Sequence, residues 1–521
     1  FPLISYPNLT KFIHPFLSLK QKEVFYPLMA FLAPFIVRSI PEVLMGVWPA
    51  GFDVMTYYAP YMYDVKSYGL VKPFSKIMHA QTAPLTYIFI GLGALVTPLD
   101  AIFLAKILSP IIYGFLGLSI FVFARRIFNW TFKKTLMATI MTTLYFVTLR
   151  FSWDMWKNTL GLAFFLLAIA YADKKEYKKF ILYSILSILF HELMTAMLSS
   201  ILIFVISYKL VKRSSDEREL VILSLVCILA FLGMGYYARW FRIFPSLPPD
   251  LPTELIPHGG GREWISLPYN YLGGQDWYGY KSINHVRLDA FLLMLKMYGP
   301  VFPFAISGFK KNIWVFSYII ISFLPFLFII LIPTMAIPAW HRFSFLLIIP
   351  LMLYAINFII DRKTLKYAYL MFLIMFAVFY MVFPPEFAFL YYGLFPSTCK
   401  YMPTSMLQNS VSITDLNDVV KSFRWLNHHI GNKSCFLAPE AYRGWARILL
   451  NRTNFKIVPY NFSLLTPQIA DTYYDKVYLI WWNRGLKWYG WEPPIGFRSL
   501  NLNDRIVIYV YTEDVVDLSD S

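Results

Sequence analysis

Charged residues are scarce in this chain. They make up 15% of its 521 residues, whereas about 25% is usual for a soluble domain. The three cysteines are too few for a fold held together by a disulfide framework. Gly259-Gly260-Gly261 lacks the Gly-Lys-Ser/Thr continuation of a phosphate-binding loop. The sequence also has no zinc-ligand spacing, no Ser-His-Asp arrangement and no internal repeat. P-loop enzymes, zinc modules and repeat solenoids are thereby excluded.

Apolar residues are correspondingly abundant. Hydrophobic residues make up 58% of the chain and aromatic residues 19%, and the mean hydropathy is +0.53. Apolar segments of roughly 20 residues, bounded by basic clusters, recur along the chain and have the length that crosses a bilayer. The composition therefore predicts a polytopic α-helical membrane protein. The chain begins at Phe1 rather than Met, which predicts a trimmed N-terminus. The apolar runs before Lys22 are too short and broken for a signal peptide.

The formal net charge is +17, from 47 Lys and Arg residues against 30 Asp and Glu residues. The distribution of these charges argues against nucleic acid as a partner. The positive residues cluster in short connectors between apolar segments, as is typical of loops retained on the cytoplasmic side of a membrane. These clusters are Arg125-Arg126, Lys133-Lys134, Lys174-Lys175, Lys178-Lys179, Lys209 to Arg213, Lys310-Lys311 and Arg362 to Lys366.

A cytoplasmic N-terminus gives a consistent topology of about eleven transmembrane helices with an extracytoplasmic C-terminus. One apolar segment, at 84–97, is left out of the count, because counting it would place Arg125 and Arg126 outside. It is short and ends at a Thr-Pro pair, so it is expected to be an interfacial or re-entrant helix. The spans are expected at 24–46, 101–124, 135–149, 157–172, 179–190, 193–208, 219–237, 288–308, 312–332, 337–360 and 366–384.

The predicted organisation has two parts. Residues 1–398 form a transmembrane domain with a first outer loop at 47–100 and a long outer loop at 238–287. From residue 399 to 521 short strands alternate with helices, which predicts an extracytoplasmic α/β domain with a largely parallel sheet. Cys399 and Cys435 both fall in this part, and a disulfide between them stays open. Helices are expected at 415–430, 441–450 and 463–474, and strands at 434–438, 455–460, 477–482 and 506–511.

The unusual polar residues of the membrane part fall on one predicted side, the outer one. Ionisable side chains near the ends of membrane helices are costly to place and often functional. The opposite face carries mostly plain Lys and Arg clusters. The outer residues are Asp53 and Asp64 in the first loop, Asp154 in the second, His191 and Glu192 at the tip of a tight hairpin, and His341 and Arg342 at the start of the tenth span.

Four features occur in a characteristic order: an acidic residue after the first span (Gly51-Phe52-Asp53), a Pro-Leu-x-Tyr stretch at residues 84–87, a helix ending at residues 121–128, and the acidic residue Asp154 in the second outer loop. In this order and sidedness the chain resembles the GT-C membrane glycosyltransferases. These include protein O-mannosyltransferases, the lipid A aminoarabinose transferase and the oligosaccharyltransferase catalytic subunits. The resemblance covers about residues 20 to 210 in detail and the remainder in layout.

This resemblance implies a GT-C-type fold and an enzyme of the cell membrane. Such enzymes use a sugar on a polyprenyl phosphate or diphosphate, and the acceptor is a protein, a lipid or a glycan at the outer face. The implied reaction is an inverting single displacement, in which a carboxylate takes the proton of the acceptor and a cation stabilises the departing phosphate. Membrane lipids are the other implied partners.

Asp53 is the candidate catalytic base, and a helix-capping carboxylate is the alternative. Asp154 is a candidate acceptor-side residue that holds a divalent cation together with Asp53, since carboxylates suit Mg²⁺ or Mn²⁺. Its alternative is an ion pair with Lys157 or Arg150. Metal dependence varies within the superfamily, so the cation stays open.

Arg342, with His341 beside it, is the best candidate for the donor phosphate, because a guanidinium can bind two oxygens at once. Lys106 is another candidate for binding the donor phosphate. For both Arg342 and Lys106 the alternative is a side chain that snorkels toward the membrane interface. His191 and Glu192 either contact donor or acceptor or form a polar turn. Arg38 and Glu42 are four residues apart in the first span and are expected to pair with each other.

Two other classes of function remain. A transporter or flippase for a lipid-linked glycan would show internal symmetry and broken helices in corresponding positions of two halves, which the sequence lacks. A non-catalytic subunit of a membrane complex, related to the glycosyltransferases, would fail to bring the outer polar groups together. The sequence does not exclude this second alternative.

Overall fold

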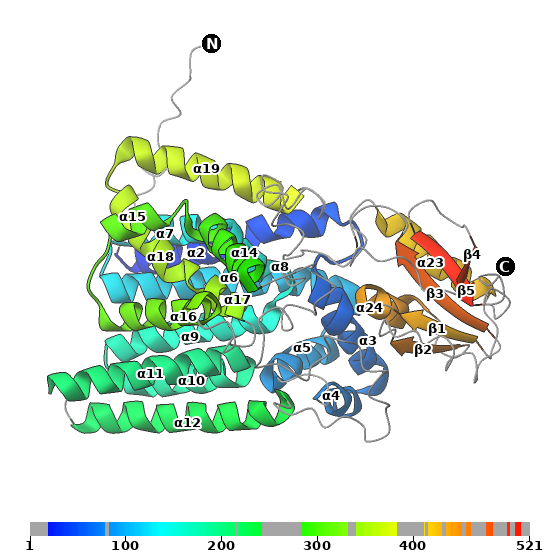
Figure 1. Cartoon of the computed structure of the whole chain (residues 1–521), viewed down its shortest axis with the longest axis horizontal. Coiled ribbons are helices and arrows are strands. Elements are labelled where there is room, and N and C mark those ends of the chain that lie inside the picture. Colours follow the sequence, from blue (N-terminus) through cyan, green and yellow to red (C-terminus); the bar gives the residue numbers. More distant parts are fainter. Residues whose placement is uncertain are drawn as a thin grey trace, which may run out of the picture.

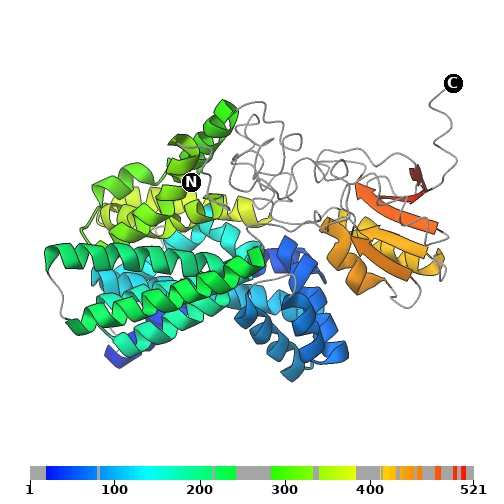
Figure 2. The same ribbon diagram turned by 60° about the horizontal axis from the view of Figure 1, so that its bottom comes forward.

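The structure is a computed structural model, and it describes residues 19–78, 83–213, 217–241, 283–331, 340–382, 411, 415–429, 434–438, 440–450, 455–459, 476–482, 497–500 and 506–511. Figures 1 and 2 show a bundle of long helices that run in roughly parallel and antiparallel directions, with a small sheet domain at one end. Between the bundle and the sheet lie three short helices of the first loop, α3, α4 and α5.

The bundle confirms a predominantly helical membrane protein. Six of its described helices are long and apolar enough to cross a membrane. The count of eleven crossings stays a prediction. The long helices are α2 (Leu19–Leu44), α6 (Ala101–Phe128), α11 (Glu192–Lys212), α12 (Glu217–Phe241), α19 (Lys363–Val382) and the segment Arg342–Ile359 within α17 (Trp340–Leu346) and α18 (Ile348–Ile359). The others are α7 (Phe132–Leu144), α8 (Phe146–Asp154), α9 (Trp156–Asp173), α10 (Tyr177–Phe190), α14 (Ile283–Tyr298), α15 (Phe302–Ser307) and α16 (Ile313–Leu331).

Close packing of α2 against α6 fixes the centre of the bundle. A Cβ atom on Gly117 would lie 2.5 Å from the carbonyl oxygen of Ala30, and one on Gly114 would lie 2.9 Å from the ring of Phe31. Small residues permit this approach, which is a common basis of helix association in membranes. The polar side chains of α2 and α6 are thereby brought close together.

The first outer loop is largely helical. A π-helix, η1 (Val54–Tyr58), continues into α3 (Ala59–Tyr68), followed by α4 (Val71–Met78) and α5 (Pro84–Val96). Helix α5 has 13 residues, so it is about 20 Å long, too short for a hydrocarbon core of about 30 Å. It packs against α3 and α10. An interfacial helix at 84–97 is therefore consistent with the structure.

Several expected spans are interrupted helices. The span expected at 135–149 divides at Tyr145 into α7 and α8, and α8 continues through the expected second outer loop to Asp154. The span expected at 288–308 also consists of two helices, α14 and α15. Apolar content predicted the segments, but it does not reveal local breaks where the chain turns within a buried environment.

The basic clusters meet one another at one end of the bundle. Arg126 forms an ion pair with Glu176, Lys134 with Asp361 at 3.4 Å, and Lys175 with Glu219 at 3.4 Å. These pairs connect four of the connectors that were assigned to the cytoplasmic side. The basic connectors therefore share one end of the bundle, as the charge pattern predicts. Which end faces the cytoplasm stays a prediction.

The C-terminal part contains a five-stranded sheet in the order β2-β1-β3-β5-β4. The strands are β1 (Ser434–Ala438), β2 (Phe455–Pro459), β3 (Lys476–Trp482), β4 (Phe497–Ser499) and β5 (Ile506–Tyr511), and the described helices are α23 (Leu416–His429) and α24 (Glu440–Leu449).

The expectation of a largely parallel sheet is wrong. Strands β2, β1 and β3 are parallel, but β5 pairs antiparallel with both β3 and β4. An antiparallel partner needs no helical crossover, and no helix was expected between residues 482 and 506. The helix expected at 463–474, Cys399, and most of the loop expected at 238–287 lie outside the described residues.

Candidate active site

Asp53 lies at the start of the π-helix that opens the first outer loop. Gly51, two residues earlier, has φ of 118°, a conformation that glycine adopts readily. The Asp53 side chain makes no capping hydrogen bond to η1, so the helix-capping alternative receives no support. Short π-helical turns occur often at functional sites, because they interrupt the regular hydrogen-bond ladder and redirect side chains.

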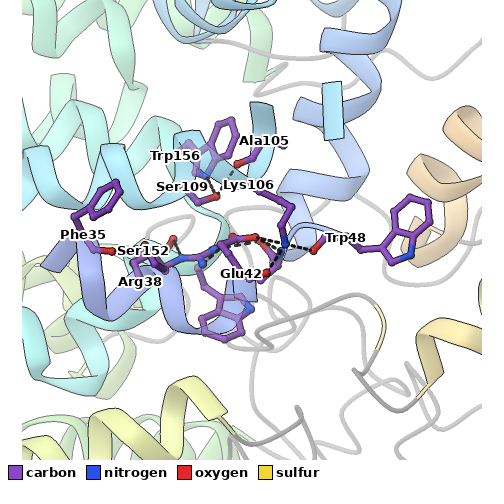
Figure 3. Close-up of polar contacts among 12 residues, drawn as sticks. Phe35, Arg38, Glu42, Trp48, Ala105, Lys106, Ser109, Ser152 and Trp156 are labelled. Atoms are coloured by element: carbon purple, nitrogen blue, oxygen red, sulfur yellow. Dashed lines mark hydrogen bonds and ion pairs between the residues drawn. The ribbon is translucent and has the colours of Figure 1, made fainter. Parts of the chain in front are cut away.

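A buried guanidinium holds the backbone that leads into Asp53 (Figure 3). Arg38 of α2 is fully buried and forms an ion pair with Glu42 at 2.8 Å, which confirms the expected pairing. It also donates a 3.2 Å hydrogen bond from Nη2 to the carbonyl oxygen of Ala50. The Glu42 carboxylate accepts a 3.1 Å hydrogen bond from the Ala50 amide. Ala50 is therefore bound through both its amide and its carbonyl, three residues before Asp53.

The same guanidinium reaches the second acidic segment. Arg38 donates to the carbonyl oxygens of Ser152 at 2.8 Å and Trp153 at 3.0 Å. These two residues directly precede Asp154, which is the last residue of α8. One side chain of the first helix thus fixes both predicted acidic segments against each other.

An aromatic stack joins the same two segments. Tyr58, at the end of η1, stacks on Trp156 with ring centroids 4.6 Å apart and an interplanar angle of 4°. The Trp156 indole also donates a 3.1 Å hydrogen bond to the Ser109 hydroxyl (Figure 3). Since both rings are buried, this contact adds apolar packing to the polar link made by Arg38.

Lys106, a candidate for the donor phosphate, lies beside this network. Its ammonium group donates to the backbone carbonyls of Glu42 and Trp48, the latter at 2.9 Å, and lies 3.7 Å from the Glu42 carboxylate (Figure 3). These contacts give Lys106 a structural role at the end of the first helix.

Tyr87 is the point where several predicted groups converge. Burial raises the pKa of its phenol well above the usual range, and the charges of Asp53, Tyr57 and Glu192 raise the pKa further. The ring packs edge-on against Tyr61 with centroids 5.1 Å apart. Asp53 and the His191-Glu192 tip therefore lie within electrostatic reach of one buried phenol, although they are far apart in the sequence.

His191 and Glu192 form the tip between α10 and α11, as the sequence predicts. The His191 Nδ1 atom caps α11 by accepting a 2.9 Å hydrogen bond from the Leu193 amide. Burial lowers the pKa of His191 to about 3; the Glu192 charge raises it, and the Lys157 and Arg342 charges lower it. Glu192 pairs with Lys157 at 3.4 Å. The charge of Arg342 therefore acts on this tip, whereas the charge of Asp53 acts, together with that of Glu192, on Tyr87.

Several polar atoms around this convergence have no hydrogen-bond partner within the part of the chain that the structure describes. All are buried, and an unsatisfied buried polar group is unfavourable in a protein that binds nothing there. They lie on the π-helix, on α3, at the hairpin tip and on α17. The atoms are Thr56 Oγ1, Tyr61 Oη, His191 Nε2 and Arg342 Nε.

The proposed divalent cation has no further support from the geometry. No group of three or more His, Cys, Asp or Glu side chains that could hold a metal ion occurs in the described ranges. Asp154 ends α8 and His341 lies within α17 beside Arg342. These backbone positions are all that the structure describes for the two residues, so their roles stay predictions.

Sequence reasoning missed three contributors to the site. Arg38 was expected only to pair with Glu42, Lys157 was considered only as a partner of Asp154, and Tyr87 was noted only as part of a motif. A buried Arg in the first span was a signal in itself, because an intramembrane charge is retained at a free-energy cost.

The fold and the site define a polytopic GT-C-type membrane protein whose candidate catalytic segment opens the first loop after α2. The EpsG family profile matches residues 46–398, and the chain belongs to the EpsG family. This family consists of GT-C-like membrane polymerases and glycosyltransferases, which confirms the resemblance drawn from the sequence.

A comparison with solved structures gives a distant likeness. The crystal structure of ArnT from Cupriavidus metallidurans bound to undecaprenyl phosphate aligns with a TM-score of 0.46 at 13% sequence identity. The alignment covers 96% of this chain and 99% of ArnT. No curated protein matches the chain.

Proposed function

We propose that this protein is a membrane glycosyltransferase that moves a sugar from a polyprenyl-phosphate-linked donor to an acceptor hydroxyl at the outer membrane face. The proposal rests on the 3.4 Å hydrogen bond from the Thr86 hydroxyl to the Phe190 carbonyl, which joins the segment of Tyr87 to the tip of His191. The charges of Asp53 and Glu192 act on Tyr87, and the charge of Arg342 acts on His191. Membership of a family of membrane glycosyltransferases and polymerases supports the reaction class. Accumulated ionisable groups in a buried setting are typical of catalytic sites.

The proposed step is a single displacement. The acceptor oxygen attacks the anomeric carbon, and its proton passes to the Asp53 carboxylate. The bond between the anomeric carbon and the phosphate oxygen breaks, and the lipid phosphate leaves with the bonding electrons. The new bond forms on the face opposite the leaving group, so the anomeric configuration inverts.

The cations of the site are assigned to the leaving phosphate. Arg342 has a buried Nε with no partner among the described residues, and a guanidinium binds phosphate oxygens well. Lys157 supplies a second positive charge near His191. Both would offset the negative charge that grows on the departing oxygen. His341 stays a candidate because it neighbours Arg342, and Asp154 stays the candidate for the acceptor side.

The test is transfer by purified protein in lipid nanodiscs, with a panel of polyprenyl-phosphate-linked and diphosphate-linked sugars as donors. Release of the lipid phosphate is measured. Asp53→Asn is expected to lower the rate by about 10²–10⁴-fold, the usual effect of losing a general base. Asp361→Asn, which changes an exposed carboxylate at the other end of the bundle, serves as the control and is expected to keep the rate.

Three results would contradict the proposal. An unchanged rate in Asp53→Asn, with the protein inserted and folded, removes Asp53 from the reaction. Absence of lipid-phosphate release with every donor, together with assembly into a larger membrane complex, would favour the non-catalytic subunit. Movement of an intact lipid-linked sugar across the bilayer would favour the transporter.

A further inference from the structure

Helix α24 of the C-terminal part packs directly on the π-helix that follows Asp53. It contacts both η1 and α3, and Figure 1 shows it on the side of the sheet that faces α3. Helix α24 lies at Glu440–Leu449, whereas the EpsG family profile ends at residue 398. The region outside the family match therefore touches the candidate catalytic segment.

Gly444 is the closest point of this contact. A Cβ atom at Gly444 would lie 1.5 Å from the carbonyl oxygen of Met55 and 2.8 Å from the Cα atom of Thr56. The opposing atoms belong to the backbone, so no side-chain rotation can make room. Met55 is the second residue of η1, two residues after Asp53. Only glycine permits the two helices to approach this closely.

Two neighbours of Gly444 extend the contact on either side of Asp53. Trp445 is buried and packs on Trp48, with ring centroids 5.0 Å apart. Arg447 forms an ion pair with Asp64 of α3. The Asp64 side chain is largely buried, with 8% exposure, so the charged partner stabilises it in a setting with little water.

We propose that α24 is a positioning element for Asp53, which rests on the proposed function of Asp53 as the base. A π-helical turn is rare and interrupts the regular α-helical hydrogen-bond ladder, so the packing of a neighbouring helix helps to define its geometry. Helix α24 supports η1 from the outside, as Arg38 supports the segment before Asp53 from the inside. The C-terminal part thus contributes to the catalytic site by holding the backbone of η1.

Gly444→Ala tests the close approach, and Gly93→Ala is the matched control. Gly93 lies in α5, and a Cβ atom there meets nothing within 4 Å. With a polyprenyl-phosphate sugar as donor, Gly444→Ala is expected to lower kcat about tenfold or more. The donor KM should change by less than about twofold, since a displaced base affects the chemical step more than ground-state binding. Gly93→Ala is expected to keep both constants.

The Asp53→Asn background distinguishes positioning from general destabilisation. If α24 acts through Asp53, Gly444→Ala should have no further effect on residual transfer by Asp53→Asn, because groups that act as a unit are not additive. If Gly444→Ala lowers the rate of transfer by the same factor in the wild-type and Asp53→Asn backgrounds, the proposal is overturned. Full activity of Asp53→Asn itself would instead contradict the proposed function, so the two failures are distinguishable.

The ion pair provides a second test that does not depend on tolerance of a larger residue at 444. Asp64→Asn, Arg447→Gln and the double variant form a double-mutant cycle. Each single variant is expected to lower kcat about threefold to tenfold, and the double variant should be no worse than either single. Multiplication of the two single effects, or kcat unchanged in all three variants, would overturn the proposal.

Discussion

Arg38 and Trp153 are joined twice, although 115 positions separate them in the chain. The guanidinium donates a 3.0 Å hydrogen bond to the Trp153 carbonyl, and its Cζ atom lies 5.2 Å from the centroid of the indole ring. Both side chains are buried. A cation over an aromatic face gains additional electrostatic attraction when it is removed from water. This contact places the end of α8 against the first helix and thereby sets the distance between the two acidic segments.

Arg38→Ala is expected to lower the free energy of unfolding by roughly 3–5 kcal/mol, because it leaves the buried Glu42 carboxylate without its closest partner. The double variant Arg38→Met/Glu42→Leu should recover most of that stability, since it removes both charges. It should not recover transfer, because the carbonyls of Ser152 and Trp153 still lack their donor. Unfolding in detergent and lipid-phosphate release measure the two effects separately.

Lys134→Ala is the control for this prediction. Lys134 pairs with Asp361, whose side chain is 72% exposed, and a pair of this kind contributes about 0–1 kcal/mol. Little change in either measurement is therefore expected. Full transfer by Arg38→Met/Glu42→Leu would show that the buried pair serves stability alone.

His191 predicts a dependence of stability on pH. Its pKa is lowered from 6.5 to about 3 in the folded protein, so the folded state holds the ring neutral while the unfolded state takes up a proton. The stabilisation is complete above the unfolded pKa of 6.5 and is lost as the pH falls from 6.5 toward 3. The expected slope is about 1.4 kcal/mol per pH unit in that window.

The measurement is thermal unfolding between about pH 7.5 and pH 5, where the slope predicts a loss of about 2 kcal/mol. His191→Asn retains a side-chain oxygen that can cap α11 and has no titrating group, so its curve should be flatter. Parallel curves for the two proteins would mean that the pH dependence comes from other groups.

Arg342→Gln is expected to raise the KM for a polyprenyl-phosphate donor about tenfold or more, because a charge-assisted hydrogen bond contributes roughly 1.5–3 kcal/mol. Arg342→Lys should have a KM between those of the wild type and Arg342→Gln, since lysine keeps the charge but not the planar fork of the guanidinium. Arg362→Gln is the matched control, because the exposed Arg362 side chain donates a 2.6 Å hydrogen bond to the Phe358 carbonyl of the preceding helix and lies over the Phe358 ring. Equal effects of the two Gln variants would remove Arg342 from donor binding.

The sequence was informative wherever the signal was local. Apolar length predicted the long helices, the Arg and Lys clusters predicted which connectors share an end, and the Thr-Pro break identified α5 as a short helix. The Arg38–Glu42 pair followed from i, i+4 spacing alone. These features depend on neighbours within one or two turns, so a linear pattern is sufficient to reveal them.

The candidate site was harder to predict from the sequence, because its parts meet through long-range packing. Nothing in the sequence indicates that the carbonyls of Ala50, Ser152 and Trp153 share one guanidinium. Backbone acceptors carry no residue-specific signal, and their convergence depends on the geometry of α2, α6 and α8. The π-helical form of η1 and the antiparallel pairing of β5 were missed for the same reason.

The linear pattern of apolar and basic residues by itself determined a multi-span membrane protein whose basic clusters share one set of connectors, because hydrophobicity and charge act on each segment separately. Only the tertiary structure decided that Arg38 joins the two acidic segments and that Gly444 brings α24 onto the turn after Asp53. The contacts of Arg38 with Trp153 and of Gly444 with Met55 join residues more than a hundred positions apart, and they depend on how closely separate helices can approach one another.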